Sequence, residues 1–392
     1  MPETVIASAC RTAIGSFRGS LSSLPAPKLG AAVVSEALKR AGIAPDRVDE
    51  VIMGNVLSAG EGQAPARQAA LFGGVPDSAQ CLTVNKVCGS GLKAVMLASQ
   101  AIAVGDAEII VAGGMESMSN VPYLLPKARD GYRMGNAEIV DGMVFDGLTD
   151  AYRHVAMGVA ADRVAKELGI TRSEQDEYAI TSYTRAQESQ RTGRFEREII
   201  PVDIPGGKTG GTTVRLDEDV TKTVFEKIPT LKPVFGADGT VTAANASKIS
   251  DGAAALVVAS GRTAEQLGMK PLARIVAQAS YARDPMEFPM APSDAITKVL
   301  LKAGLSLSAI DLFEINEAFA MVPLAVAKQL GIGIDRINVN GGAVAMGHPI
   351  GASGARILVT LLHAMEQRNL RRGLATLCIG GGEASAVIVE RM

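Results

Sequence analysis

One cysteine of the sequence stands where a reactive thiolate could form. Cys88 lies in "LTVNKVCGSGLKAVM", between a predicted strand and a predicted helix, and Gly89 and Gly91 follow it. Free backbone amides and the positive end of a helix dipole lower the pKa of a thiol, and glycines let a substrate approach the backbone. Cys88 is therefore a candidate nucleophile. The alternative is a buried structural cysteine, the common state of a lone cysteine in a large chain.

The C-terminal part of the sequence supplies candidate partners for this thiol. His348 lies in the glycine-dense segment "NGGAVAMGHPIGASGAR", at what reads as a strand–loop–helix junction, and Cys378 ends the apolar run "ATLCI" before three glycines. Asn316 and Glu317, in "FEINEAFA", come just after a predicted strand. The carboxyl ends of parallel strands are where α/β folds collect catalytic side chains. These positions favour a role in chemistry for at least some of the four residues.

The elements that must position these residues alternate along the chain. Strands are predicted over 48–55, 80–85 and 107–114, and helices over 28–41 and 89–104. Short apolar strands separated by helices of this length are typical of layered α/β folds. We therefore expect a mostly parallel sheet that is buried on both faces.

The second part of the sequence repeats the first. Residues 38–55 match residues 300–316, and Gly42 and Gly304 in this match stand 262 positions apart. Residues 111–117, "VAGGMES", resemble "CIGGGEAS" near the C-terminus with a similar shift. Two ordered matches indicate a duplicated βα domain.

A segment of different composition separates the two repeats. Residues 119–248 hold most of the turn-rich and charged sequence and predict a loop domain inserted into the first repeat. We expect an N-terminal domain over 1–268, which includes this insertion, and a C-terminal domain over 269–392.

Composition argues against several other classes of protein. The formal net charge of −2 supplies no general attraction to nucleic acid or to an anionic membrane. The apolar run at 253–259 is far shorter than a membrane-spanning helix. The cysteines show no C-x-x-C spacing and there are only three histidines, which makes a zinc module an unfavoured reading. We expect a soluble, cytoplasmic protein with no nucleic-acid or membrane partner.

The order of the motifs along the whole chain is similar to that of the thiolase family. The matching segments are "NKVCGSGLKAVMLASQAI", "AGGMESMSNVPY", "GTVTAANAS", "INEAFA", "NVNGGAVAMGHPIGASGARI" and "CIGGGEAS". They resemble most the thiolases that handle acetoacetyl-CoA. The resemblance implies a five-layer αβαβα fold built from two duplicated domains plus a loop domain, and a homotetramer arranged as a dimer of dimers.

The resemblance also assigns catalytic roles. Cys88 resembles the nucleophile that becomes acetylated, His348 the base that takes its proton, and Cys378 the second acid–base group. Asn316 would hold a water that donates with His348 to an enolate, and the amides of Cys88 and Gly380 would form a second oxyanion hole. The implied activity is the reversible Claisen condensation of two acetyl-CoA to acetoacetyl-CoA plus CoA, with ping-pong kinetics. Coenzyme A is then substrate and product, and no cofactor is required.

Binding residues for coenzyme A follow only from the resemblance. Ser247 would contact the pantetheine amide, and Lys222, Lys227 and Tyr183 would lie near the nucleotide end. The channel would be lined by Ala243, Leu148, Met157, Phe235, Ala318 and Phe319. Some relatives hold a potassium ion with a tyrosine and backbone carbonyls, and the positions here are Tyr183, Ala243, Ala244, Ala246 and Val344. A potassium site and a metal-free protein both stay open.

Two alternative functions remain open. One is a degradative 3-ketoacyl-CoA thiolase, which runs the same chemistry on a broader range of chain lengths. The other is a non-catalytic thiolase-fold protein that binds coenzyme A or lipid. At the channel, Ala156 stands where many short-chain thiolases carry a histidine, whereas Phe288 and Met290 would crowd the acyl end. We expect a preference for acetoacetyl-CoA.

Overall fold

A computed structural model describes residues 3–206 and 210–392, and eleven strands of these residues form one sheet. Across the sheet the order is β13 (Leu312–Ile315), β14 (Arg372–Ile379), β15 (Glu383–Arg391), β12 (Ala273–Ala282), β1 (Thr4–Thr12), β11 (Ser250–Ser260), β5 (Ile109–Ser117), β3 (Glu50–Gly54) and β4 (Gln80–Val84). The short β2 (Gly15–Ser16) and β8 (Ile199–Ile200) pair with β11 and β1.

The sheet is mixed, so the prediction of a mostly parallel sheet was wrong. The pairs β13–β14, β5–β3 and β3–β4 are parallel, whereas every pair along the main path from β14 to β5 is antiparallel. The β14–β15 pair is antiparallel because a tight turn joins these two strands instead of a crossover helix. Gly381 and Gly382 in this turn have φ of 88° and 89°, a conformation that glycine adopts without strain.

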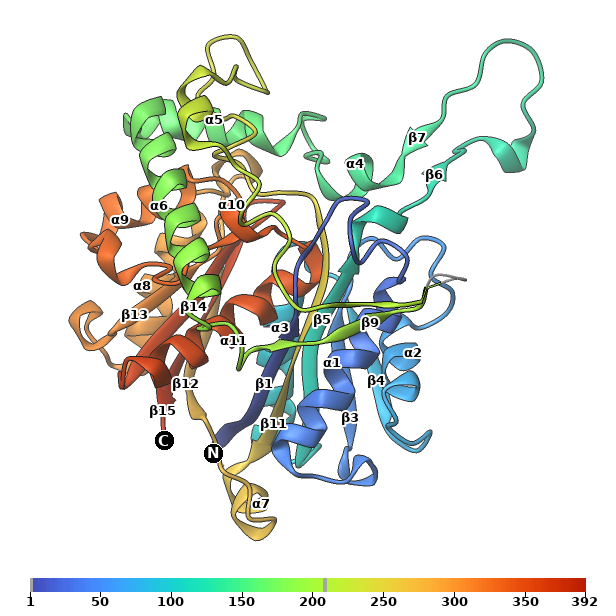
Figure 1. Cartoon of the computed structure of the whole chain (residues 1–392), viewed down its shortest axis with the longest axis vertical. Helices are drawn as coiled ribbons and strands as arrows, with labels where there is room; N and C mark the ends of the chain where they lie inside the picture. Colours follow the sequence, from blue (N-terminus) through green and yellow to red (C-terminus); the bar gives the residue numbers. More distant parts are fainter. Residues whose placement is uncertain (1–2, 207–209) are drawn as a thin grey trace.

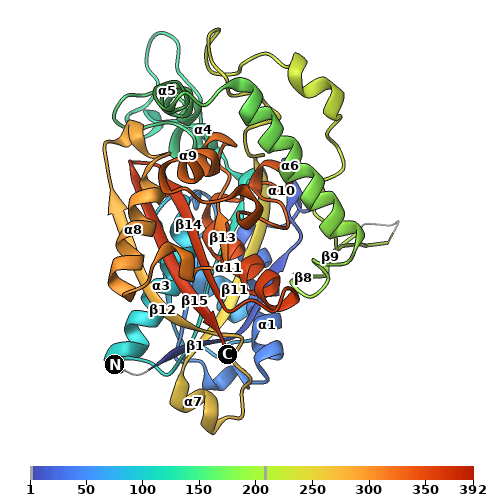
Figure 2. The same ribbon diagram turned by 90° about the vertical axis from the view of Figure 1, so that its left-hand side faces the viewer.

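The helices and the two halves of the sheet form layers (Figures 1 and 2). They are α1 (Ala26–Ala41), α2 (Pro65–Phe72), α3 (Ser90–Val104), α8 (Ala291–Ala303), α9 (Met321–Leu330) and α11 (Ile350–Gln367). α1 and α2 pack on the outer face of the β1–β11–β5–β3 half, and α8 and α9 on the outer face of the β12–β15–β14–β13 half. α3 and α11 pack together between the two halves. This confirms the predicted αβαβα layers.

Alternation along β11 shows how one strand serves two layers. Ala255 and Val257 belong to the apolar cluster under α1, whereas Leu256 and Val258 belong to the cluster with α3 and α11. Successive side chains of a strand point to opposite faces, so a strand covered on both faces is apolar throughout. The run at 253–259 has this composition.

The two halves share their order of elements. α1 precedes β3 and ends at Gly42 (φ 68°), and α8 precedes β13 and ends at Gly304 (φ 65°). β5 pairs antiparallel with β11 in the first half, as β14 does with β15 in the second. The proposed domain boundary at 268 falls between the short helix α7 (Gly261–Gln266) and β12.

The segment between β5 and β11 lies over one end of the sheet (Figures 1 and 2). Its helices are α4 (Gly142–Gly147), α5 (Met157–Leu168) and α6 (Arg172–Arg191), followed by the 3-10 helix η4 (Phe225–Thr230). Its short strands are β6 (Tyr123–Leu124), β7 (Val140–Asp141), β9 (Val202–Ile204) and β10 (Thr212–Val214). The loop that joins β6 to β7 extends away from the body of the molecule (Figure 1).

Among the described residues, one segment has the length and composition of a membrane-spanning helix. It covers 87–104, with a mean hydropathy of 1.5, although its longest apolar run is short. Its helix, α3, lies between α11 and β5, and 56% of the segment is buried. Its apolar composition is therefore that of a core helix.

Candidate active site

A strained turn between β4 and α3 carries Cys88. Val87 has φ of 45°, a left-handed conformation that β-branched residues rarely adopt. The Ser90 hydroxyl holds this turn, since it accepts the Lys86 N–H at 2.8 Å and donates to the Val87 carbonyl at 2.6 Å. Lys86 also forms an ion pair with Glu383. These contacts fix Cys88 against the glycine turn that follows β14.

Three of the predicted site residues meet at the sulfur of Cys88. The backbone amides of Gly380 and of Cys88 itself lie near this sulfur and lower the pKa of the thiol. Cys378, at the end of β14, lies close enough that a charge on Cys88 would raise the Cys378 pKa. The structure therefore places two amides where the resemblance puts an oxyanion hole, with a second thiol beside them.

His348 lies in a different local setting from the predicted one. It follows the short helix α10 (Ala343–Met346) and not a strand, and it stands two residues before the start of α11. The segment before α10 contributes only an isolated bridge from Ile337 to Phe313 of β13. The strand–loop–helix prediction was therefore wrong at this position. The two halves still share one feature here. Cys88 and His348 each lie in a loop that precedes a helix of the central layer, α3 or α11.

The hydrogen bonds of His348 define its tautomer. Nδ1 lies 2.5 Å from the Ser353 hydroxyl, and that hydroxyl donates its only hydrogen to the Pro349 carbonyl at 2.8 Å. Ser353 must therefore accept, which puts the ring proton on Nδ1. Nε2 is left with its lone pair and accepts from Asn316 Nδ2 at 3.3 Å. An imidazole in this state can take a proton at Nε2.

A buried arginine stands behind this pair. Arg356 is 2% exposed, and its guanidinium donates to Asn316 Oδ1 at 3.3 Å, so that the amide NH₂ of Asn316 faces His348. Glu314 lies 3.7 Å from Arg356. Burial and, secondly, the Arg356 charge lower the pKa of His348 to about 3. His348 is therefore neutral at physiological pH. Sequence reasoning missed Arg356, which was quoted only as the last arginine of a motif.

The pKa of Cys88 differs from the sequence-based expectation. Burial raises it to about 11, although the amides of Gly380 and Cys88 act in the opposite direction. Removal from water outweighs the two amides, and Cys88 precedes Ser90, the first residue of α3, by two positions. Burial also raises the pKa of Cys378 well above its usual value. The resting site therefore holds neutral thiols, and a thiolate must form by proton transfer to a base.

A pH experiment checks this resting state. A thiol with a raised pKa is protonated below that pKa, so its thiolate fraction rises about tenfold per pH unit up to the pKa of about 11. We expect the rate of iodoacetamide alkylation at Cys88, followed by peptide mass spectrometry on the ligand-free protein, to keep rising through about pH 10, where a thiol of ordinary pKa levels off. A plateau below that pH would contradict a dominant effect of burial.

Glu116, at the end of β5, ties the two halves together at this site. Its carboxylate accepts hydrogen bonds from Asn55 Nδ2 (3.0 Å), from the amides of Val56 and Leu57 (both 3.1 Å), and from the amide of Gly351 (2.8 Å). It thereby fixes the start of α11, three residues after His348, to the half that carries Cys88. Sequence reasoning quoted "AGGMES" without a role for this residue. The available signal was a lone acid at the end of an apolar strand.

Two predicted channel residues lie beside the reactive sulfur. Leu148 packs with Val87 and Cys88 in one apolar cluster, and its carbonyl accepts the Met157 amide at 3.0 Å. The Met157 methyl lies beside the Gly380 backbone. The structure therefore brings Leu148 and Met157 to the site.

Three further predicted channel residues form a second group with Ser247 and Phe288. The rings of Phe235 and Phe319 meet edge-to-face with centroids 6.3 Å apart. Ala318 precedes Phe319, and its carbonyl accepts the Ser247 amide at 3.0 Å. Phe288 lies on the other side of Phe319 at 6.4 Å and is 2% exposed. Ser247 is thus held against the aromatic group by its own backbone.

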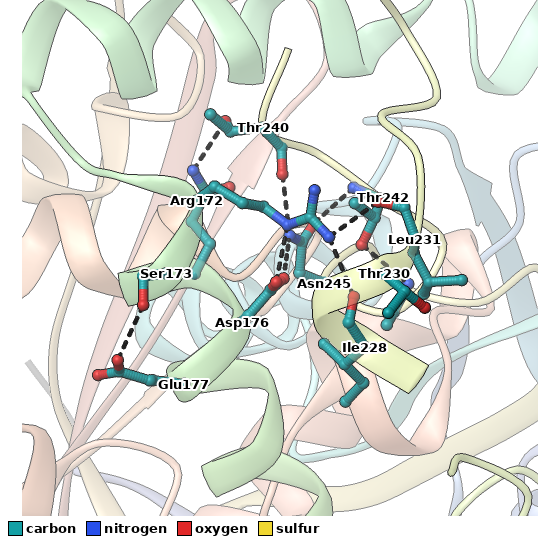
Figure 3. Close-up of polar contacts among 12 residues, drawn as sticks. Arg172, Ser173, Asp176, Glu177, Ile228, Thr230, Leu231, Thr240, Thr242 and Asn245 are labelled. Carbon is teal, nitrogen blue, oxygen red and sulfur yellow. Dashed lines mark hydrogen bonds and ion pairs between the residues drawn. The ribbon is translucent and has the colours of Figure 1, made fainter. Parts of the chain in front are cut away.

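The loop that carries Ser247 is anchored to α6 (Figure 3). Asn245 Nδ2 donates to Asp176 at 2.9 Å and to the Thr240 carbonyl at 3.0 Å, while Asn245 Oδ1 accepts the Thr242 amide at 2.7 Å. Arg172 donates to the same Asp176 at 2.7 Å and to two carbonyls of η4 and its C-cap, at Ile228 and Leu231. A buried polar network with this many partners fixes a loop well.

The two lysines predicted near the nucleotide end differ in their surroundings. Lys222 Nζ contacts Glu218 at 2.9 Å, Asp219 at 3.1 Å and the Ser16 hydroxyl at 2.7 Å. Its charge is already matched by two carboxylates, which a CoA phosphate would have to displace. Lys227 is exposed on η4. The role of both lysines stays a prediction.

The residues of the suggested potassium site fit that ion only in part. The Tyr183 hydroxyl is buried and finds no hydrogen-bond partner among the described residues, which suits a cation. The Ala243 carbonyl, however, already accepts the Lys248 ammonium at 2.5 Å. Ala244 and Val344 are buried, and Ala246 forms a bridge with Phe319. In this arrangement the Lys248 ammonium already binds the Ala243 carbonyl that a potassium ion would use.

Comparisons with known proteins agree with this geometry. The N-terminal domain model of the thiolase family matches residues 4–262, and its C-terminal domain model matches residues 269–391. The acetyl-CoA acetyltransferase of Cupriavidus necator is 54% identical over 392 residues, 100% of both chains. The mitochondrial acetyl-CoA acetyltransferase of Bos taurus is 51% identical over 100% of this chain and 92% of its own.

A solved structure gives the same result. The Acat5 thiolase of Ascaris suum, in complex with coenzyme A, matches with a TM-score of 0.94 and 44% identity over 100% of both chains. Fold, motif order and full-length identity therefore agree, and this chain belongs to the thiolase family.

Proposed function

We propose that this chain is an acetyl-CoA C-acetyltransferase, an acyltransferase that reversibly condenses two acetyl-CoA to acetoacetyl-CoA and CoA. The relatives that are 51–54% identical over their full length carry this name. The observation that carries the proposal is the setting of the Cys88 sulfur, where two backbone amides lower the pKa of the thiol and the thiol of Cys378 lies nearby. A nucleophile, an oxyanion hole and a second acid–base group are what thioester Claisen chemistry needs.

In the first half-reaction, Cys88 attacks the carbonyl carbon of acetyl-CoA. The thiol proton moves to a base, for which we propose Nε2 of His348, and leaves with the departing CoA thiolate as CoA–SH. The carbonyl oxygen becomes an oxyanion in the tetrahedral intermediate, and the amides of Cys88 and Gly380 are placed to donate to it. One thioester replaces another, so this step is close to isoenergetic.

In the second half-reaction, Cys378 first gives its thiol proton to Nε2 of His348, and the resulting thiolate removes a proton from the methyl group of another acetyl-CoA. The resulting carbanion attacks the acetyl group on Cys88 and releases the Cys88 sulfur, which takes the proton back from His348. We propose that His348 and a water held by Asn316 stabilise the enolate oxygen, with His348 donating when Nε2 carries a proton. The 3.3 Å contact between Asn316 and His348, and the Arg356 bond that orients Asn316, support this pairing.

We further propose that the enzyme needs no cofactor and acts as a homotetramer in the cytoplasm. β4 ends the sheet with an unpaired edge and an exposed Leu82, which a second subunit could extend. The β6–β7 loop exposes Met134 and Ile139, which a further contact could cover. The four cysteines are free among the described residues, which suits a reducing compartment. The mitochondrial relatives carry the same name, so a reducing organelle is the competing location.

Substrate length separates this function from a degradative thiolase. Phe288 and Met290 are buried against the Phe319 side of the channel, which favours a short acyl pocket, whereas Ala156 opens space next to Met157. Each methylene that clashes costs about 1–3 kcal/mol. We expect acetoacetyl-CoA to be cleaved best, with four-to-six-carbon or 2-methyl substrates tolerated, and kcat/KM for 3-ketodecanoyl-CoA to be lower by about 100-fold or more.

The measurement is thiolysis across a series of 3-ketoacyl-CoA lengths under one set of conditions. Comparable kcat/KM for the ten-carbon substrate would move the protein to the degradative class. Binding of CoA without turnover of any member of the series would support the non-catalytic alternative.

A further inference from the structure

Lys248 folds its side chain back over the loop that carries Ser247. Its ammonium donates to the Ala243 carbonyl at 2.5 Å, five residues earlier in the chain. The same ammonium lies 5.7 Å from the centre of the Tyr183 ring. A carbonyl oxygen and an aromatic face both attract a cation. The side chain of Lys248 therefore closes the 243–248 loop and joins it to α6.

The backbone of Lys248 connects the same loop to the catalytic histidine. The Lys248 carbonyl accepts the His348 amide at 3.0 Å, while the preceding residue, Ser247, donates its amide to the Ala318 carbonyl at 3.0 Å. A shift of the loop would therefore move a CoA-binding residue and the backbone of His348 together. The middle of the loop is held independently by the Asn245–Asp176 contact.

The Tyr183 ring contacts a cation and a second aromatic ring. The Lys248 ammonium lies 5.7 Å from its centre, and the ring centroid of Phe225 in η4 lies 6.1 Å from it. The Tyr183 hydroxyl is 0% exposed and has no hydrogen-bond partner within residues 3–206 and 210–392. A buried hydroxyl without a partner is costly, and a cation or an ordered water would satisfy it. The Ala243 carbonyl and the Tyr183 ring thus form one site for a monovalent cation, whereas the Lys248 ammonium leaves the Tyr183 hydroxyl without a partner among the described residues.

We propose that Lys248 is the built-in cation of this site, so that the enzyme positions its CoA-binding loop and His348 without a potassium ion. An ammonium group resembles K⁺ in charge and size, and here it takes the Ala243 carbonyl. Because it is tethered to the loop that it stabilises, it needs no ion concentration to stay bound. Lys248 is on this view a positioning residue, which touches neither substrate nor the reacting atoms. The expected change in KM rests on the proposed function, whereas the expected change in Tm does not.

The test replaces the ammonium and offers a free ion. Lys248→Ala and Lys248→Met are compared with the unchanged enzyme in KCl, NaCl and choline chloride at equal ionic strength. Thiolysis of acetoacetyl-CoA gives KM and kcat, and the Tm is followed by circular dichroism. The control is Lys302→Ala on α8, which removes another lysine whose ammonium donates to a carbonyl, that of Gln278 at 3.2 Å.

For the unchanged enzyme we expect the same KM and Tm in all three salts. For both Lys248 variants in choline chloride we expect KM to rise about tenfold, the loss expected for one charged hydrogen bond, with a smaller change in kcat and a lower Tm. KCl should restore KM and Tm along a saturating curve, and NaCl should do so less well because Na⁺ is smaller. Lys302→Ala should respond to no salt.

Three results would overturn the proposal. They are a saturating rise in Tm or activity of the unchanged enzyme with K⁺, a normal KM for both variants in choline chloride, and variants whose loss K⁺ does not repair. If the unchanged enzyme cleaves no acetoacetyl-CoA while K⁺ raises the Tm of the Lys248 variants alone, the proposed function fails and the built-in cation stands.

Discussion

Replacing Cys88 with alanine should abolish both thiolysis and condensation, with kcat/KM lowered by about 10⁴-fold or more. Covalent catalysis cannot proceed without its nucleophile, and removal of a nucleophile that acts together with its base costs this much or more in other enzymes. The two amides that converge on this sulfur have no reacting partner once it is gone. The measurement is thiolysis of acetoacetyl-CoA, with the acetyl group of acetyl-CoA mapped by mass spectrometry in the unchanged enzyme.

The label should lie on Cys88 alone. A matched control is Cys81→Ala, because Cys81 lies on β4 near the Arg67 guanidinium and outside the site, and this variant should keep its activity. Acetylation found chiefly on Cys378 would reverse the two roles. Turnover of Cys88→Ala within tenfold of the unchanged enzyme would remove the covalent mechanism altogether.

Replacing Cys378 with alanine should separate the two half-reactions. General acid–base groups contribute about 10²–10⁴-fold, so condensation and α-proton exchange should fall by at least this range. Acetylation of Cys88 should survive, because its two amide donors and the His348 contacts with Ser353 and Asn316 do not involve Cys378.

Deuterium exchange into the methyl group of acetyl-CoA, measured by mass spectrometry, reports the lost step directly. The amount of acetyl-Cys88 formed in the same sample shows that the first half-reaction is intact. Near-normal exchange in Cys378→Ala would assign α-proton removal to another group. Loss of acetylation together with exchange would mean that Cys378 supports the fold of the site.

The layers and the grouping of the site residues could be predicted because each rests on a short segment. Cys88, His348 and Cys378 each lie near glycines at the end of a helix or strand. A pattern of this kind can be read from a few consecutive residues of the sequence. The direction of the strands could not be read in the same way. A strand such as β11 is apolar on both faces whether its neighbours are parallel or antiparallel, because helices cover it on both sides.

The charge state of the site was beyond the sequence for a different reason. The position of Cys88 near the start of a helix predicts a lowered pKa for its thiol. The actual pKa depends on how much water is removed from the thiol when segments far apart in the sequence pack around it. The contacts of Glu116 and Arg356 are equally remote: Glu116 meets the Gly351 amide across 235 positions of sequence. Lys248 was missed because nothing local distinguishes a lysine that folds onto its own loop from a solvated one.

The strained backbone at Val87 has a consequence for how this protein can change over evolutionary time. A β-branched residue in a left-handed conformation costs about 1–3 kcal/mol, and glycine at this position would relieve that cost. The Val87 side chain, however, packs beside Gly380 and belongs to the apolar clusters around Cys88. The backbone cost and the packing gain therefore oppose each other at this one residue, and a change to glycine would relieve the backbone while it removed the side chain that packs around the nucleophile.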